Sequence, residues 1–473
     1  MHDTHQALAV LPSVNDVVDA VMAQTVVSRA LVVLRAREII ARYRDLIQHD
    51  DRLAEDRFVL AARIVEEVRS SLAPGLHRVI NATGVVLHTG LGRAPLADEA
   101  IEALVDVARF CNVQADLDEG ARSLREAHVE SLLRHITGCE AATVVNNNAA
   151  ATLLALAALA TGREVVVSRG ELVEIGGSYR IPEVMAQSGA VMVEVGCTNR
   201  THLRDYEAAI TDRTAAIMKV HTSNYAIQGF TSEVKLAELS PLAKKRGLLL
   251  IHDMGSGSLV DLAPYGLADE PPAASSIQQG ADVVTFSGDK LVGGPQAGIA
   301  IGTLALIERL RAHPLARAVR VDKLVLASLE ATLRLLLDPQ TARERVPTLR
   351  MITAPPDELF RRAKRLARAL GRRLAAPVAL SPGVSRAGSG AFPVLELPTF
   401  VVEIEPGPLG AAEAARRLRQ GIPSVFVRIA KDRLMVDVRT VFPDEERELV
   451  SALCAVVTSP ESDPTTGMQR GTR

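Results

Sequence analysis

The spacing of apolar residues divides the chain into three parts, of which the first is helical. Up to about residue 72, apolar side chains recur every three or four positions with arginines between them, most clearly over residues 30–47. This period predicts amphipathic helices, and no strand-like alternation appears before Arg78. Pro74 and Gly75 then interrupt the pattern. We therefore predict a helical N-terminal domain over residues 1–72.

The second part, residues 73–325, alternates short β-rich runs with helical segments. The runs predicted as strands are 142–145, 164–168, 191–195, 215–220, 248–252, 283–287 and 298–302. Strands that alternate with helices form a mostly parallel sheet with both faces covered, and such sheets bind ligands beyond the carboxyl ends of their strands. The pattern thus predicts an α/β catalytic domain with its site at that edge.

The third part, residues 326–458, is predicted to form a smaller α+β domain. It begins with helical stretches, including a very basic run at 361–373, and continues with candidate strands at 399–404 and 434–438. From residue 459 the chain is rich in Ser, Pro, Thr and Gly, which predicts a disordered tail over 459–473.

Composition and charge exclude several classes of protein. A hydrophobic fraction of 48% is ordinary for a globular chain, and a formal net charge of -2 means that any RNA contact must come from a local basic patch. The longest apolar stretch, 149–160, is shorter than the roughly 20 residues that span a bilayer. No cationic segment followed by an apolar run appears near the start. We expect a cytoplasmic protein without a membrane segment.

The cysteines give no sign of a metal site or a disulfide framework. They lie far apart and form no CxxC pair, at Cys111, Cys139, Cys197 and Cys454. Free thiols in a reducing compartment and no bound metal are therefore the expectation.

One strand end carries a run of asparagines. The strand at 142–145 leads through Asn146, Asn147 and Asn148 into an Ala/Leu-rich helix. Free backbone N–H groups and the positive end of the helix dipole make such a helix start suitable for a phosphate. An asparagine here is equally typical of a helix N-cap, so both interpretations stay open.

Two further strand ends supply an acid and a lysine. The apolar strand at 248–252 is followed by Asp253 and small residues, a pattern suited to a buried carboxylate that pairs with a pyridinium nitrogen. The strand at 283–287 ends in Ser287 and delivers Lys290 into a Gly-rich turn. Partial burial lowers the pKa of a lysine and makes it a Schiff-base nucleophile. Ser287 is a further candidate to bond a phosphate.

Taken together, the three strand ends indicate one kind of enzyme. Lys290 follows Asp253 by 37 residues (290 − 253), which leaves room for one helix and one strand between them. The candidate phosphate site at the asparagine run, the acid and the lysine would therefore lie at one edge of the same sheet. That order is what a pyridoxal-phosphate enzyme of the aminotransferase-like fold, fold type I, requires. The sequence has no GxxxxGK[ST], HExxH or GxSxG motif, and Gly255 and Gly257 lack the third glycine of a dinucleotide fingerprint.

Long stretches of the chain resemble one family, bacterial selenocysteine synthase, or L-seryl-tRNA(Sec) selenium transferase. The resemblance runs from about residue 11 nearly to the tail and is carried by residues 80–96, 144–151, 165–182, 219–231, 255–266, 286–298 and 317–323. It implies a pyridoxal-phosphate enzyme that eliminates the serine hydroxyl of seryl-tRNA(Sec). Selenium from selenophosphate then adds to the dehydroalanyl-tRNA, which gives selenocysteinyl-tRNA(Sec).

The resemblance also implies roles for individual residues. Lys290 would hold the cofactor as a Schiff base and Asp253 would pair with its ring nitrogen. Asn147, Asn148 and Ser287 would help to hold its phosphate.

Further residues are placed around the reaction by the same resemblance. Asp289 is a candidate general acid or base. His221 is a candidate cofactor contact, with a core histidine as the alternative. Arginines resemble those that surround the selenium donor, and a guanidinium suits an oxyanion. They are Arg93, Arg122 or Arg125, Arg317 and Arg320. The stretch around Arg122 and Arg125 departs from the family's Lys-Arg-Gly-Ser-Arg pattern, and His252 stands where Thr or Tyr is more familiar.

The expected partners follow from the family. The tRNA would be gripped partly by the N-terminal helices, where Arg35, Arg37, Arg42 and Arg44 could form a phosphate-contacting face or a merely solvated one. The resemblance further implies a homodecamer, a ring of dimers, with no DNA partner. Two alternatives stay open: a lyase of the same fold acting on small amino acids or sugar acids, which tends to lack the N-terminal helices, and a tRNA-binding protein with a vestigial core.

Overall fold

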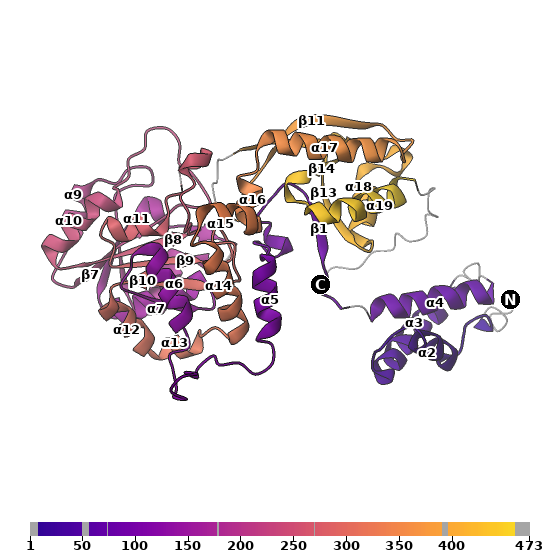
Figure 1. Ribbon diagram of the computed structural model, residues 1–473, viewed down its shortest axis with the longest axis horizontal. Coiled ribbons are helices and arrows are strands. Elements are labelled where there is room, and N and C mark those ends of the chain that lie inside the picture. The colour runs from indigo at the N-terminus through magenta and orange to yellow at the C-terminus, as the bar shows by residue number, and fades with distance from the viewer. Residues whose placement is uncertain are drawn as a thin grey trace. The chain divides into compact units, whose positions relative to one another are not determined.

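The computed structural model describes residues 8–49, 56–72, 74–176, 179–268, 270–389 and 396–458 (Figure 1). The chain separates into two units, residues 1–78 and 79–473. The tail predicted to be disordered lies outside the described residues. No helix in the described ranges is long and apolar enough to cross a bilayer.

The N-terminal unit is helical in its described part, as the three-four spacing predicts. Its helices are α2 (Val14–Met22), α3 (Arg29–His49) and α4 (Arg57–Ser71). Ser13 begins α2 with a capping box, in which its side chain accepts from Asp16 N and the Asp16 carboxylate accepts from Ser13 N. The apolar faces pack together around buried residues that include Val21, Ile40 and Ile64. This unit therefore has a core of its own.

A seven-stranded sheet forms the centre of the second unit within the described residues, in the order β2-β10-β9-β8-β7-β3-β6. Neighbouring strands are parallel except that β10 runs antiparallel to both β2 and β9. The strands are β2 (Ala141–Val145), β3 (Glu164–Ser168), β6 (Val191–Val195), β7 (Thr214–Val220), β8 (Leu249–Gly255), β9 (Val283–Ser287) and β10 (Gly298–Gly302). All seven predicted strands are present, so the predicted mostly parallel α/β sheet is confirmed.

Two hydrophobic cores cover the two faces of this sheet. Successive strand residues point to opposite faces, so Val165 belongs to one core and Val166 to the other. One face is covered by α7 (Asn148–Ala160), α8 (Ile181–Ser188) and α12 (Leu304–Ala312). The other is covered by α6 (Ala127–Thr137), α9 (Leu203–Ala209), α10 (Leu236–Arg246), α11 (Ala273–Gln278) and α14 (Lys323–Leu335). Burial on both faces explains why the strands read as continuous apolar runs.

Shorter elements connect these layers. They are α5 (Asp98–Asp106), which packs against α14, the hairpin β4 (Glu174–Ile175) and β5 (Tyr179–Arg180), and the helices α13 (Pro314–Ala318), α15 (Pro339–Arg345) and α16 (Pro347–Ile352). Pro at the start of α13, α15 and α16 suits the first helical turn, whose N–H groups have no intrahelical partner.

The C-terminal part contains a second sheet, drawn largely in orange and yellow (Figure 1), with the order β1-β13-β14-β12-β11. Its elements are β1 (Val79–Ala82), α17 (Pro356–Gly371), β11 (Val378–Ser385), β12 (Leu397–Ile404), α18 (Ala411–Gln420), β13 (Ser424–Ala430), β14 (Arg433–Asp437) and α19 (Glu446–Val457). The strands predicted at 399–404 and 434–438 are β12 and β14. β1 pairs in parallel with β13, so a strand from the segment expected in the catalytic domain joins this sheet instead.

Candidate active site

A cavity of about 290 Å³ lies at the carboxyl ends of β7, β8 and β9. Crossovers between parallel strands bring these ends to one edge, where the sequence predicted a site. Eight of the residues predicted for the site line this cavity: Arg93, Asn147, Asn148, His221, Asp253, Ser287, Asp289 and Lys290. The acid and the lysine are thus brought together as their strand positions predict.

Asp253 forms the buried floor of the cavity. Its side chain accepts hydrogen bonds from Asn148 Nδ2 at 2.8 Å, Gly255 N at 3.2 Å and Thr285 Oγ1 at 3.4 Å. Burial raises the pKa of Asp253, and the Asn148 hydrogen bond and the charge of Lys290 only partly oppose that rise. A carboxylate in this state gains from a cationic partner in the cavity.

Lys290 reaches the same cavity from the Gly-rich turn after β9 and is 5% exposed. Burial, followed by the nearby charge of Arg93, lowers the pKa of Lys290, while Asp289 and Asp253 pull it upward. A lowered pKa enlarges the fraction of neutral amine at a given pH. The lysine is therefore suited to attack an aldehyde.

The start of α7 forms one wall of the cavity. Asn147 is the N-cap of α7, and its side chain accepts from Ala150 N at 2.9 Å, so the capping interpretation holds for this residue. Gly298 of β10 packs so closely here that a Cβ would overlap the Asn147 carbonyl oxygen. Ser287, at the end of β9, is 7% exposed and lines the cavity. The phosphate-binding role of these residues stays a prediction.

His221 follows β7 and has a buried acidic partner. Its Nε2 lies 3.2 Å from Oε1 of Glu270, and Glu270 also accepts from Ser256 Oγ at 2.6 Å. Burial by itself would lower the pKa of His221, but the hydrogen bond and charge of Glu270 outweigh it and raise the pKa. The side chain is thus stabilised as a cation that faces the cavity.

His252, which departs from the resembled family, lies away from this chemistry. It precedes Asp253 on β8 and so points to the opposite face of the sheet. There it is buried, with Nδ1 2.9 Å from Ser276 Oγ in α11. Burial lowers the pKa of His252 to about 3, and His221 and Lys219 add to this effect. The residue is a neutral core histidine.

Arg93 and Asp289 form an ion pair beside Lys290. Arg93 Nη1 lies 2.6 Å from Asp289 Oδ2, and Asp289 is largely buried while Arg93 remains partly open to the cavity. A bound oxyanion can therefore reach the guanidinium from the open side, and Asp289 holds that guanidinium in place.

The other candidate arginines lie outside the lining of this cavity among the described residues. Arg122, Arg317 and Arg320 are exposed, although the backbone of Arg320 bridges to Val145 at the end of β2. Arg125 donates to Val321 O and Gln114 Oε1, and burial, then Arg320, lowers its pKa. Whether they bind a donor remains a prediction.

Tyr179 is a cavity residue to which the sequence assigned no role. Its hydroxyl donates to Asp253 Oδ2 at 3.4 Å, and burial followed by the Asp253 charge raises its pKa. Tyr179 lies in the stretch 165–182 that carries the family resemblance, and that resemblance was the only sequence signal that could have pointed to it. Thr285 and Glu270 were also missed, because their contacts depend on sheet register and on a loop.

Pyridoxal phosphate fits this cavity by its chemistry. Two buried polar atoms of lining residues, Asn148 Oδ1 and Ser223 Oγ, have no hydrogen-bond partner in the structure. Buried polar groups usually have partners, so their presence in a cavity indicates a polar ligand. Lys290 can hold the aldehyde carbon, Asp253 the ring nitrogen and the α7 start the phosphate. In the described residues, no cluster of His, Cys, Asp and Glu is placed to hold a metal ion.

The chain is similar to known proteins along most of its length. The chain is 49% identical over 466 residues to an L-seryl-tRNA(Sec) selenium transferase of Solidesulfovibrio magneticus, covering 96% of this chain and 98% of that one. It is 51% identical over 435 residues to the enzyme of the same name from Desulfomicrobium baculatum, covering 89% and 93% of the two chains.

A solved structure of D-glucosaminate-6-phosphate ammonia-lyase shares the fold, with a TM-score of 0.56 and 22% identity over 81% of this chain and 96% of that one. The predicted fold type I architecture is thereby confirmed. The family model described as L-seryl-tRNA selenium transferase matches residues 79–442. The chain therefore belongs to the L-seryl-tRNA selenium transferase family.

Proposed function

We propose that this protein converts seryl-tRNA(Sec) to selenocysteinyl-tRNA(Sec), with pyridoxal phosphate as cofactor and selenophosphate as selenium donor. The observation that carries the proposal is the meeting of Lys290 and Asp253 on one cavity, in a chain that belongs to the selenium transferase family. The near full-length match to named relatives includes most of the N-terminal unit, which favours the tRNA substrate over a small amino acid.

The cofactor, when bound, withdraws electrons from the α-carbon of the substrate amino acid and so makes its α-proton acidic. Asp253 would keep the ring nitrogen protonated, and hydrogen bonds from Asn148 and Thr285 hold its carboxylate. Lys290 Nζ, whose pKa is lowered by burial, would accept the α-proton. Asp289, beside Lys290, is the second group that can donate or accept a proton.

Arg93 is the described cavity residue best suited to the donor. Its guanidinium offers planar, paired N–H groups to a phosphate-like oxyanion, and the ion pair with Asp289 orients it. The atoms balance: the serine hydroxyl leaves as water, the selenium–phosphorus bond is cleaved with water, and phosphate is released. Arg320, whose backbone bridges to the end of β2, is a second candidate for the same oxyanion.

Partners and place of action complete the proposal. The N-terminal helices would contact the tRNA through the exposed side of α3, where Arg37 and Arg44 lie. A homodecamer in the cytoplasm, where charged tRNAs are used, is the form that we propose. These statements rest on the family resemblance.

Replacing Lys290 tests the proposal directly. Lys290→Ala should remove the visible absorption of the bound cofactor and reduce formation of selenocysteinyl-tRNA(Sec) by about 10³-fold or more, because no other lysine is among the described residues that line the cavity. Lys244→Ala on the exposed side of α10 is the matched control and should leave both unchanged. An unchanged spectrum in Lys290→Ala would remove the basis for the cofactor assignment.

A further inference from the structure

The segment of residues 83–94 joins the small C-terminal sheet to the active-site cavity. It follows β1, which belongs to the small sheet, and its last residues include Arg93, which lines the cavity beside Lys290. Its start and its end therefore contact two different layers of the same unit. We call residues 83–94 the connecting segment.

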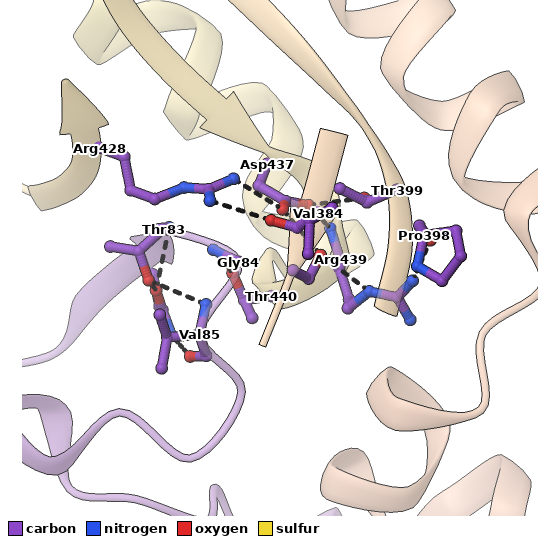
Figure 2. Close-up of polar contacts among 12 residues, drawn as sticks. Thr83, Gly84, Val85, Val384, Pro398, Thr399, Arg428, Asp437, Arg439 and Thr440 are labelled. Carbon is purple, nitrogen blue, oxygen red and sulfur yellow. Dashed lines mark hydrogen bonds and ion pairs between the residues drawn. The ribbon is translucent and has the colours of Figure 1, made fainter. Parts of the chain in front are cut away.

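The start of the connecting segment is pressed against Asp437. Gly84 has a φ of +74°, and a Cβ at this position would overlap the Asp437 carboxylate. Gly84 N donates to Thr440 Oγ1 at 3.0 Å, and Gly84 O accepts from Arg386 N at 2.9 Å. Figure 2 shows Gly84 facing Thr440 and Asp437 in this way. Only glycine can bring the backbone this close in this conformation.

Asp437 is itself held by hydrogen bonds from several segments of the small domain. Its side chain is fully buried and accepts from Ser385 Oγ at 2.8 Å, Thr399 Oγ1 at 2.9 Å and Arg439 N at 3.1 Å. Arg428 Nη2 lies 3.3 Å from Oδ2 and completes the charge pairing. A carboxylate that accepts this many hydrogen bonds is held in one position, so the backbone of Gly84 packs against a fixed group.

Arg439 extends this network toward the catalytic layer. Its guanidinium is almost fully buried and donates to Ser385 Oγ at 2.9 Å, Met351 O at 2.7 Å and Pro398 O at 2.5 Å. Met351 lies in α16, which precedes the small domain. Figure 2 shows the guanidinium directed toward Pro398, away from Arg428. Arg428 and Arg439 thus bind opposite sides of the polar residues around Asp437.

The backbone conformation of Arg93, near the far end of the connecting segment, requires support from surrounding contacts. Arg93 adopts a φ of +63°, a conformation that non-glycine residues keep only where surrounding contacts enforce it. Between the ends, Val86 N donates to Arg386 O at 3.0 Å and Leu87 N to Ala387 O at 2.7 Å. Beyond them, Arg93 N donates to His88 O at 3.0 Å. Backbone hydrogen bonds therefore hold the connecting segment at several points between Gly84 and Arg93.

We propose that Asp437, Arg439 and Thr440 form a positioning site for the reaction, acting through Gly84 and the connecting segment to set Arg93 against Asp289. The small C-terminal domain thereby determines the geometry in which Arg93 meets the donor oxyanion. The donor role of Arg93 rests on the proposed function. None of the three residues lines the active-site cavity, so they are positioning residues.

Thr440→Val is the sharpest test, because it removes the hydroxyl that accepts from Gly84 N and keeps the side-chain shape. In the holoenzyme, the KM for selenophosphate should rise about five- to tenfold, the size expected for one lost hydrogen bond, with kcat nearly unchanged. Thr440→Ser keeps the hydroxyl and should restore the wild-type KM. Thr353→Val is the matched control, since the Thr353 hydroxyl donates to Leu349 O in its own turn.

A double-mutant cycle with Arg93→Ala separates positioning from general stability. If Thr440 acts through Arg93, adding Thr440→Val to Arg93→Ala should raise the KM no further. An equal rise in both backgrounds, or an unchanged KM in Thr440→Val, would overturn the proposal. Should Thr440→Val fail to fold, Thr440→Ala supports the same comparison with a smaller side chain.

Binding of inorganic thiophosphate, measured by calorimetry, gives a readout that does not need turnover. Thr440→Val should weaken this binding by the same factor as it raises the KM, and equal binding by wild type and Thr440→Val would contradict the positioning role. If the wild-type protein binds thiophosphate but makes no selenocysteinyl-tRNA(Sec), the proposed function fails while the positioning test still stands.

Discussion

Lys290 lies between groups that push its pKa in opposite directions. Burial and the Arg93 cation lower it, whereas Asp289 and Asp253 raise it. The strand pattern was sufficient to predict that Lys290 and Asp253 meet, because both follow apolar strands of one parallel sheet. It could not predict that the charge of Arg93 lowers the pKa of Lys290, since the position of Arg93 depends on the backbone path of residues 83–94.

Arg93→Ala should shift the pH dependence of cofactor capture. Without the arginine, the like-charge repulsion on protonated Lys290 disappears and Asp289 is freed to stabilise that cation, so the lysine pKa rises. Less neutral amine is then present at a given pH. The midpoint for cofactor uptake by the apoenzyme, followed by absorption, should move up by about one pH unit.

Arg93→Lys keeps the positive charge and serves as the control for that measurement. Its midpoint should stay within a few tenths of a unit of the wild-type value. A midpoint that stays unchanged or moves down in Arg93→Ala would contradict the inference that Arg93 lowers the pKa of Lys290.

At the scale of elements, the strands that escaped prediction have identifiable causes. β11 contains Pro382 and Gly383, which interrupt a strand pattern, yet the structure tolerates them because β11 is an edge strand. β13 also escaped prediction, because it joins the predicted β14 at Lys431 and Asp432, both with positive φ, without the Asn-Gly or Asp-Gly signal of a tight hairpin. The seven central strands were predictable because each is a short, nearly continuous run of apolar residues.

Gly298→Ala should damage the wall of the cavity that α7 and β10 form. The added Cβ would overlap the Asn147 carbonyl, which is backbone and cannot rotate away, so β10 and the start of α7 must separate. We expect a loss of about 1–3 kcal/mol in the free energy of unfolding. Cofactor affinity, measured by equilibrium dialysis, should fall at least about tenfold if the α7 start holds the phosphate.

Gly371→Ala is the matched control, because a Cβ at the end of α17 meets nothing within 4 Å. It should leave cofactor affinity unchanged and alter stability by less than about 1 kcal/mol, in the stabilising direction. Equal cofactor affinity in Gly298→Ala and Gly371→Ala would show that the phosphate does not depend on this wall.

At the scale of the whole chain, our proposal assigns the tRNA contact to the N-terminal unit and the catalytic site to the second unit. The contact of Gly84 with Thr440 joins residues 356 positions apart, and no local pattern in a single sequence could predict it. Of the four arginines expected to form a tRNA-contacting face on α3, two are engaged in ion pairs, Arg35 with Glu38 and Arg42 with Glu67. The proposed tRNA contact therefore narrows to the exposed Arg37 and Arg44.

The double variant Arg37→Glu and Arg44→Glu should weaken binding of seryl-tRNA(Sec) by about tenfold at moderate salt and flatten the salt dependence, because two phosphate contacts are lost. Filter binding across a salt series measures both. The cofactor spectrum should not change, since the second unit has its own cores.

The same charge change at the C-terminal end of α17, Arg368→Glu with Arg372→Glu at the C-cap, is the control for that experiment. Both residues are exposed, and we expect α17 to be solvated rather than bound to tRNA. A larger loss of affinity from the α17 variant than from the α3 variant would move the tRNA contact to the small domain.

The central claim is that the Lys290 site acts on serine carried by tRNA. Its most direct test is the visible absorption spectrum of the holoenzyme, titrated separately with seryl-tRNA(Sec), uncharged tRNA(Sec) and free serine. The account predicts a spectral change with seryl-tRNA(Sec) alone. A change with free serine and none with the charged tRNA would contradict it and place the protein among lyases that act on small amino acids.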